Sequence, residues 1–124
     1  MIEVNDLWFD YDGHPVLKGV SFEISSGEIV AIMGENGAGK TTLIKHFNGL
    51  LKPKRGYVKI FGVDTREATV AQLSRKVGLI FQNPDHQLFA ETVKDEVSFA
   101  LKNFGFPKDV IEVRVEKILK MLDL

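Results

Sequence analysis

The chain has 124 residues, of which 44% are hydrophobic, so it carries enough apolar surface for one modest domain with a packed core. Its formal net charge of -1 argues against a large basic surface and therefore against a nucleic-acid partner. The absence of cysteine excludes disulfides and thiolate metal sites. No apolar run approaches the roughly 20 residues that span a bilayer, so we expect no direct membrane insertion.

The first expected elements are two strands joined by a tight turn. Residues 2–9 and 16–24 alternate between apolar and polar side chains, and the segment between them contains Asp12-Gly13. This pattern predicts an antiparallel β-hairpin. Residues 28–33 then form a short, nearly continuous apolar run, which is typical of a buried parallel strand.

A glycine-rich segment follows this run directly. Residues 34–42 read G-E-N-G-A-G-K-T-T and match the phosphate-binding pattern G-x-x-x-x-G-K-S/T. Successive backbone N–H groups in such a turn converge on phosphate oxygens, and glycines permit the close approach. We therefore predict that the segment binds the phosphates of a nucleotide together with Mg²⁺. The expected contacts are Gly34, Asn36, Gly37, Ala38, Gly39, Lys40, Thr41 and Thr42.

Three side chains at the end of this loop have separate expected roles. Lys40 places a full positive charge near the β- and γ-phosphates, and we expect it to be catalytic. The Thr41 hydroxyl is expected to ligate Mg²⁺, and the Thr42 hydroxyl to add a further contact to phosphate.

The rest of the chain shows strand patterns first and helical spacing afterwards. Apolar positions beyond Asp109 predict a core-facing stripe at Val110, Val113 or Arg114, Ile118 and Leu122. The expected elements are a helix over 41–50, a strand over 57–61, a short helix over 70–76, a buried strand over 77–81, and helices from 92 to 101 and from 109 to 122.

Several polar residues are assigned no chemistry. The histidines His14, His46 and His86 lie far apart and have no paired metal-ligand spacing. Asp95 and Glu96 are adjacent on an expected helix, where their side chains diverge by about 100°, so they do not form an acid–base pair. The basic cluster at Lys52, Lys54 and Arg55 is interpreted as a solvated helix exit.

The sequence of the phosphate loop, together with residues 17–22 (L-K-G-V-S-F) before it, resembles that of the ATP-binding cassette (ABC) family. Within this family Tyr11 falls where an aromatic ring stacks on adenine, and Val16 where an aliphatic side chain contacts the base or ribose. Gln82 is similar to the Q-loop glutamine, which contacts Mg²⁺ or the attacking water. The resemblance therefore implies a catalytic and metal-associated role for Gln82.

The segment 81–89 (F-Q-N-P-D-H-Q-L-F), continued by T-V-K-D-E-V at 92–97, is similar to the ATPase subunits of energy-coupling factor importers, which take up cobalt, nickel and vitamins. This resemblance implies an ATP hydrolase that pairs head to tail with a second ATPase subunit. It also implies integral membrane partner subunits and a peripheral location at the cytoplasmic face of the cell membrane. An ABC-type ATP-binding module without a transport role is the alternative.

The expected fold class is α/β: a partial P-loop NTPase (ABC ATPase) core with an amino-terminal β-hairpin and the beginning of a helical subdomain. We expect the nucleotide-binding core at 1–82 and the helical subdomain from 83 to 124. The family's Walker B aspartate, Ser-Gly-Gly signature and switch histidine follow the Q-loop, and this chain contains no Gly-Gly pair. We therefore expect an amino-terminal portion of a longer ATPase that cannot hydrolyse ATP by itself.

Overall fold

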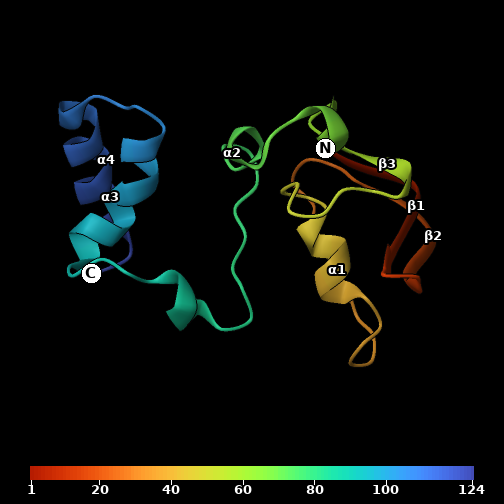
Figure 1. The fold of residues 1–124 in the computed structure, drawn as a ribbon. Coiled ribbons are helices and arrows are strands. Elements are labelled where there is room, and N and C mark those ends of the chain that lie inside the picture. The colour runs from red at the N-terminus through yellow and green to blue at the C-terminus, as the bar shows by residue number, and fades with distance from the viewer. The chain divides into compact units, whose positions relative to one another are not determined.

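The computed structural model describes residues 1–124 as two compact units, Met1–Leu79 and Ile80–Leu124 (Figure 1). The first unit contains a β-sheet and short helices, and the second contains two longer helices. The division lies after Leu79, and the expected functional boundary after Gln82 stays a prediction.

The predicted hairpin is confirmed. Its strands are β1 (Ile2–Tyr11) and β2 (His14–Ile24), which pair antiparallel. Tyr11 pairs with His14, so the turn consists of Asp12 and Gly13 alone, with φ angles of 48° and 85°. Two consecutive positive φ angles define the turn whose twist matches that of the flanking strands, and Asp-Gly suits it well.

Two further strands complete a sheet in the order β2-β1-β3-β4, in which every neighbouring pair is antiparallel. They are β3 (Arg55–Ile60) and β4 (Val63–Asp64). The strand predicted over 57–61 is therefore present and begins two residues earlier. A 3₁₀ turn (Thr65–Glu67) and α2 (Val70–Leu73) follow, so the second predicted helix is shorter than 70–76.

The core of the first unit lies between this sheet and the helix that follows the phosphate loop. The buried hydrophobic side chains come from β1, β2, β3, α2 and the segment 43–47. They are Val4, Leu7, Phe9, Leu17, Leu43, Phe47, Val58, Ile60 and Leu73. Packing against this core fixes the start of the helix relative to the hairpin.

The helix itself, α1 (Lys40–Lys45), is shorter than the predicted 41–50. The chain turns after it, and Gly49 takes a positive φ of 78°. Lys52 is not simply solvated, as we had expected, because its ammonium group donates hydrogen bonds to the carbonyls of Thr65 and Ala68. These bonds tie the turn after α1 to the segment that follows β4.

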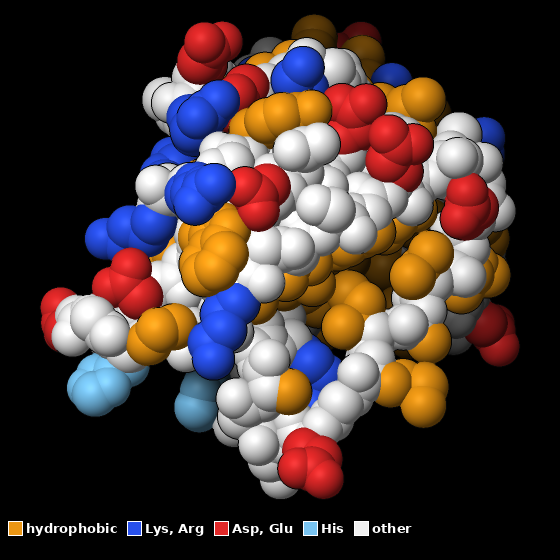
Figure 2. Space-filling model, turned by 90° about the vertical axis from the view of Figure 1, so that its right-hand side faces the viewer, with side chains coloured by type: hydrophobic (Ala, Val, Ile, Leu, Met, Phe, Trp, Pro, Cys, Tyr) orange, Lys and Arg blue, Asp and Glu red, His pale blue; other side chains and the backbone are white.

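The strands predicted over 28–33 and 77–81 are not present. Ile29 is fully exposed, and Met33 and Ile80 are 87% and 81% exposed. A strand needs a neighbouring strand to satisfy its backbone groups, and the four strands of the sheet pair only with one another. Figure 2 shows hydrophobic side chains gathered on the face seen there, among charged side chains of both signs.

The second unit is a pair of helices that follows a 3₁₀ turn. Its elements are η2 (Pro84–Gln87), α3 (Val93–Asn103) and α4 (Lys108–Met121). The Thr92 hydroxyl accepts a hydrogen bond from the Asp95 N–H at 3.1 Å and caps α3. No helix in the chain is both long enough and apolar enough to cross a membrane.

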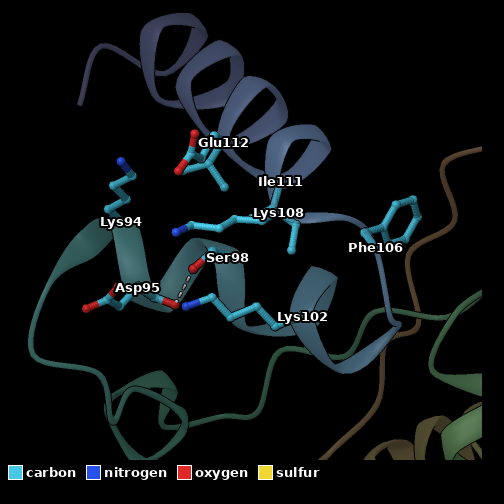
Figure 3. Close-up of a pocket in the computed structure, with 9 residues that line it drawn as sticks. Lys94, Asp95, Ser98, Lys102, Phe106, Lys108, Ile111 and Glu112 are labelled. Carbon is cyan, nitrogen blue, oxygen red and sulfur yellow. Dashed lines mark hydrogen bonds between the residues drawn. The ribbon is translucent and has the colours of Figure 1, made fainter.

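The core-facing side of α4 differs from the predicted stripe. Ile111 and Val115 are buried, whereas Val113 and Leu122 are 68% and 58% exposed. The expected register was therefore wrong, because several apolar residues in this helix face outward and obscure the period of 3.6. A pocket of about 380 Å³ lies between α3 and α4. Figure 3 shows Ile111 and lysines from both helices among the side chains that line it.

Candidate nucleotide-binding site

The phosphate loop, residues 34–39, leads directly into α1 and lies against the hairpin. Gly39 precedes α1 with a φ of 98°, which favours glycine. A Cβ atom on Gly39 would lie 3.0 Å from Val16 Cγ1 and 3.2 Å from Leu17 Cδ2. The end of the loop therefore contacts β2, and the structure places Val16 beside it.

The donor set of the loop fits a phosphate group. No side chain caps the amino-terminal end of α1, and the first N–H groups of a helix have no partner within it. Gly37 has a φ of 84°, and a Cβ atom there would meet nothing within 4 Å. The Ala38 N–H donates to the Glu35 carbonyl at 3.1 Å and closes the turn. Asn36 and Ala38 are exposed on this loop.

Lys40 reaches back over the loop that precedes it. Its ammonium group donates to the carbonyl oxygen of Gly34 and, at 2.9 Å, to that of Glu35. A Cβ atom on Gly34 would approach Ala38 Cβ at 3.2 Å, so glycine keeps this part of the loop narrow. The positive charge of Lys40 and the backbone of the loop are thus held within one small volume.

Tyr11 and Thr42 are brought together, although they lie in different elements. The Tyr11 hydroxyl is 3.3 Å from Thr42 Oγ1, and the Tyr11 ring packs edge-to-face on Phe9 with centroids 5.0 Å apart. Thr42 is buried, whereas Tyr11 is 43% exposed and so retains an open ring surface. The stacking role expected for Tyr11 stays a prediction.

His46 is the residue near the loop whose role the sequence did not reveal. Its ring is fully buried, Nδ1 lies 2.7 Å from the Thr42 carbonyl oxygen, and Nε2 has no hydrogen-bond partner. Burial lowers the pKa of His46 below its ordinary value of 6.5, and this outweighs the opposite effects of the Thr42 and Lys52 backbone groups. The spacing of four residues between Thr42 and His46 on an expected helix was the signal that could have found it.

The two residues expected at Mg²⁺ lie in different units. Thr41 is exposed in the first turn of α1, beside the loop, and its hydroxyl chemistry suits a hard cation. Gln82 belongs to the second unit. Both metal roles stay predictions. The chain contains no cluster of three or more His, Cys, Asp or Glu side chains that could hold a metal ion by themselves.

The segment after Gln82 is held by side chains of its own unit. The Phe81 N–H donates to Gln87 Oε1 at 2.8 Å. Glu96 Oε2 accepts hydrogen bonds from the N–H groups of Phe89 at 3.2 Å and Ala90 at 2.8 Å. Glu96 thus has a structural role that its sequence position did not indicate.

Comparison with known proteins identifies relatives along the whole chain. The family described as ABC transporter matches residues 17–124. A putative ABC transporter ATP-binding protein of Pyrococcus furiosus is 51% identical over 100% of this chain and 48% of its own length. An energy-coupling factor transporter ATP-binding protein, EcfA, of Methanocaldococcus jannaschii is 46% identical over 100% of this chain and 46% of its own length. The chain thus spans about half the length of these relatives.

Solved structures resemble the fold as a whole. The cbiO1 protein of Clostridium perfringens, part of the ABC transporter complex cbiONQ, superposes with a TM-score of 0.85 at 39% identity, over 96% of this chain and 49% of its own. A dimeric ATP-binding cassette bound to ADP and Pi gives a TM-score of 0.78 at 26% identity, over 100% of this chain and 58% of its own. The partial P-loop NTPase fold expected from the sequence is confirmed, and the chain belongs to the ABC transporter family.

Proposed function

We propose that the chain is the nucleotide-binding portion of an ATPase subunit of an energy-coupling factor importer, which couples ATP binding and hydrolysis to uptake across a membrane. The observation that carries this proposal is the phosphate loop together with the start of α1, because Gly39 lies against Val16 and Thr42 contacts Tyr11 of the hairpin. Relatives named energy-coupling factor transporter ATP-binding proteins, at 46% and 48% identity, support the type of importer.

In this proposal the loop and hairpin bind opposite ends of ATP. Backbone N–H groups of the loop and the Lys40 ammonium hold the phosphates, and the Thr42 hydroxyl adds a contact. The exposed face of Tyr11 stacks on adenine, with Val16 beside the base or ribose. The contact between Tyr11 and Thr42 holds the hairpin and the start of α1 in a fixed position relative to each other.

Mg²⁺, when bound, neutralises charge that develops on the β- and γ-phosphate oxygens. The Thr41 hydroxyl and the Gln82 side chain would hold it. The Lys40 charge acts at the same oxygens and lowers the energy of the transition state. Gln82 contributes through Mg²⁺ or the attacking water, as the family resemblance implies. Lys40 and Gln82 are therefore the catalytic residues of this proposal.

The partners belong to the whole protein. A second ATPase subunit joins head to tail and closes each nucleotide site, and integral membrane subunits form the transport path. The protein then sits at the cytoplasmic face of the membrane. Cobalt or nickel ions and vitamins are the substrates that we favour, because the segment 81–97 resembles importers of these compounds.

Transport by the full-length protein, assembled with its membrane subunits in vesicles, tests the proposal. We expect Lys40→Ala to reduce ATP-driven uptake to background, because the variant lacks the charge that contacts the phosphates. Lys45→Ala is the matched control, since Lys45 lies at the other end of the same helix and should leave uptake unchanged. Unaffected uptake in Lys40→Ala would refute the transport role.

An ABC-type module that binds ATP without a transport role is the second candidate. The nucleotide site described above suits it equally well. Stimulation of ATP hydrolysis by co-purified membrane subunits distinguishes the two, because only a transport ATPase gains rate from such partners.

A further inference from the structure

The end of α1 leaves one buried carbonyl group for a side chain to satisfy. The N–H of His46 donates to the Leu43 carbonyl at 3.1 Å, three residues back, instead of to Thr42, four residues back. The Thr42 carbonyl therefore receives no hydrogen bond from the His46 backbone. The His46 ring supplies it, because Nδ1 lies 2.7 Å from that oxygen. A carbonyl only accepts, so the proton resides on Nδ1.

His46 also completes a closed set of contacts around the candidate site. Thr42 lies 3.3 Å from the Tyr11 hydroxyl through its own Oγ1. The Phe9 ring packs edge-to-face on both Tyr11 and His46, with centroids 5.0 and 4.9 Å apart. The four side chains thus join the expected adenine contact on β1 to the expected phosphate contact on α1, and His46 is the member farthest from solvent.

We propose that His46 is a positioning residue for ATP, which holds the Thr42 backbone and, through it, the Thr42 hydroxyl and Tyr11. The inference rests on the proposed function, because it assigns His46 to the same nucleotide site. The Nδ1–H group of His46 donates a hydrogen bond to the Thr42 carbonyl at 2.7 Å, and this is the contact that reaches the candidate site. A side chain that presents an N–H at the position of Nδ1 should therefore keep the contact with Thr42.

Substitutions at His46 in the full-length protein test this role through the dissociation constant for Mg-ATP. His46→Leu fills the space but offers no donor, and we expect about tenfold weaker binding, equivalent to about 1.4 kcal/mol. His46→Asn places an amide N–H close to the position of Nδ1, and binding should stay within about twofold of the wild type. His86→Asn is the matched control, because His86 is an exposed histidine of the other unit. Binding is measured at a temperature where circular dichroism shows each variant folded.

The outcomes separate the inference from the proposed function. If the wild type fails to bind Mg-ATP, the proposed function is wrong. If the wild type binds and His46→Leu binds equally tightly once corrected for its folded fraction, His46 is merely a packing residue and the inference is overturned. If His46→Leu does not fold, His46→Gln replaces it, because its longer side chain places the amide beyond the position of Nδ1. Weaker Mg-ATP binding by His46→Gln than by His46→Asn supports the inference. Equal binding by the two variants overturns it.

Discussion

At the scale of single residues, the burial of His46 makes the stability of the first unit depend on pH. The unfolded chain protonates this histidine near its ordinary pKa of 6.5, whereas burial lowers the pKa in the folded state. The unfolded state therefore binds more protons below that pH. We expect the free energy of unfolding to fall as the pH drops from 6.5 through the lowered pKa. Urea unfolding, followed by the fluorescence of Trp8 at about pH 7.5 and about pH 5.5, measures the change.

A substitution identifies His46 as the source of this dependence. His46→Asn cannot titrate in this range, so its stability should change less between the two pH values. Asp64 does not interfere, because its hydrogen bonds with Arg66 lower its pKa from 3.8 and place its contribution in a more acidic range. If the free energy of unfolding of His46→Asn changes with pH as much as that of the wild type, other groups cause the dependence.

Two glycines with similar backbone angles allow strain and crowding to be separated. Gly13 and Gly39 have φ angles of 85° and 98°, so alanine at either position costs about 1–2 kcal/mol in conformational strain. A Cβ atom at Gly13 meets nothing within 4 Å, whereas one at Gly39 meets Val16 and Leu17 at 3.0 and 3.2 Å. Gly39→Ala should therefore lower the free energy of unfolding more than Gly13→Ala. Equal losses would show that β2 moves aside easily.

At the scale of elements, Glu96 fastens the segment before α3 to the helix. Its carboxylate accepts the N–H groups of Phe89 and Ala90, and the Phe89 ring packs edge-to-face on Phe99 at 4.6 Å. We expect Glu96→Ala to raise the hydrogen-exchange rates of these two amides by roughly ten- to a hundredfold, because a hydrogen bond to a charged acceptor contributes about 1.5–3 kcal/mol. Exchange is read by mass spectrometry on peptides that cover 88–92.

Two controls isolate the acceptor. Glu96→Gln keeps an oxygen in place and should show a smaller rise, because the charge alone is lost. Glu91→Ala removes an exposed carboxylate in the same segment and should leave both amides unchanged. If Glu96→Ala exchanges at the wild-type rate, the Phe89–Phe99 contact holds the segment without Glu96.

Elements specified by local signals were predictable from the sequence, and those that need a distant partner were not. The turn at Asp12-Gly13 and the loop at 34–42 depend on contiguous residues, and both are present. The strands expected over 28–33 and 77–81 require neighbouring strands, which the pairing in the sheet does not provide. In the candidate site, the four-residue spacing of Thr42 and His46 could have indicated their contact, but the Tyr11–Thr42 contact and the full burial of His46 depend on how α1 packs against β1.

At the scale of the whole molecule, the exposed apolar segment at 28–33 bears on the part of the relatives' length that this chain does not span. The chain covers 48% of the Pyrococcus furiosus relative, and Ile29 is fully exposed in the structure. We expect a longer protein to bury Ile29 between further strands. Ile29→Asp should then lower the melting temperature of the full-length protein by several degrees, because a buried charge without a partner is costly.

The same substitution in the 124-residue chain provides the comparison. Because Ile29 is fully exposed in this chain, Ile29→Asp should leave the melting temperature of the 124-residue chain unchanged. The variant should also aggregate less, since an exposed apolar side chain is replaced by a charge. Thr41, which is exposed near the loop, is not a suitable control because it belongs to the proposed site. Ile29→Leu is the matched control, because it keeps an apolar side chain at the same position and should leave both melting temperatures nearly unchanged. Equal tolerance of Ile29→Asp in both lengths would mean that the segment stays on the surface.

The hydrogen bonds of Lys40 to the Gly34 and Glu35 carbonyls change how its variants should be interpreted. A phosphate that binds must compete with these two carbonyl oxygens for the Lys40 ammonium group, so the measured affinity is the difference between the two sets of contacts. Lys40→Ala removes the contacts to the carbonyls in the free protein as well as the contact to the phosphate in the complex. The loss of affinity in Lys40→Ala therefore combines a missing attraction with a more loosely folded loop, and it is no direct measure of the lysine–phosphate bond.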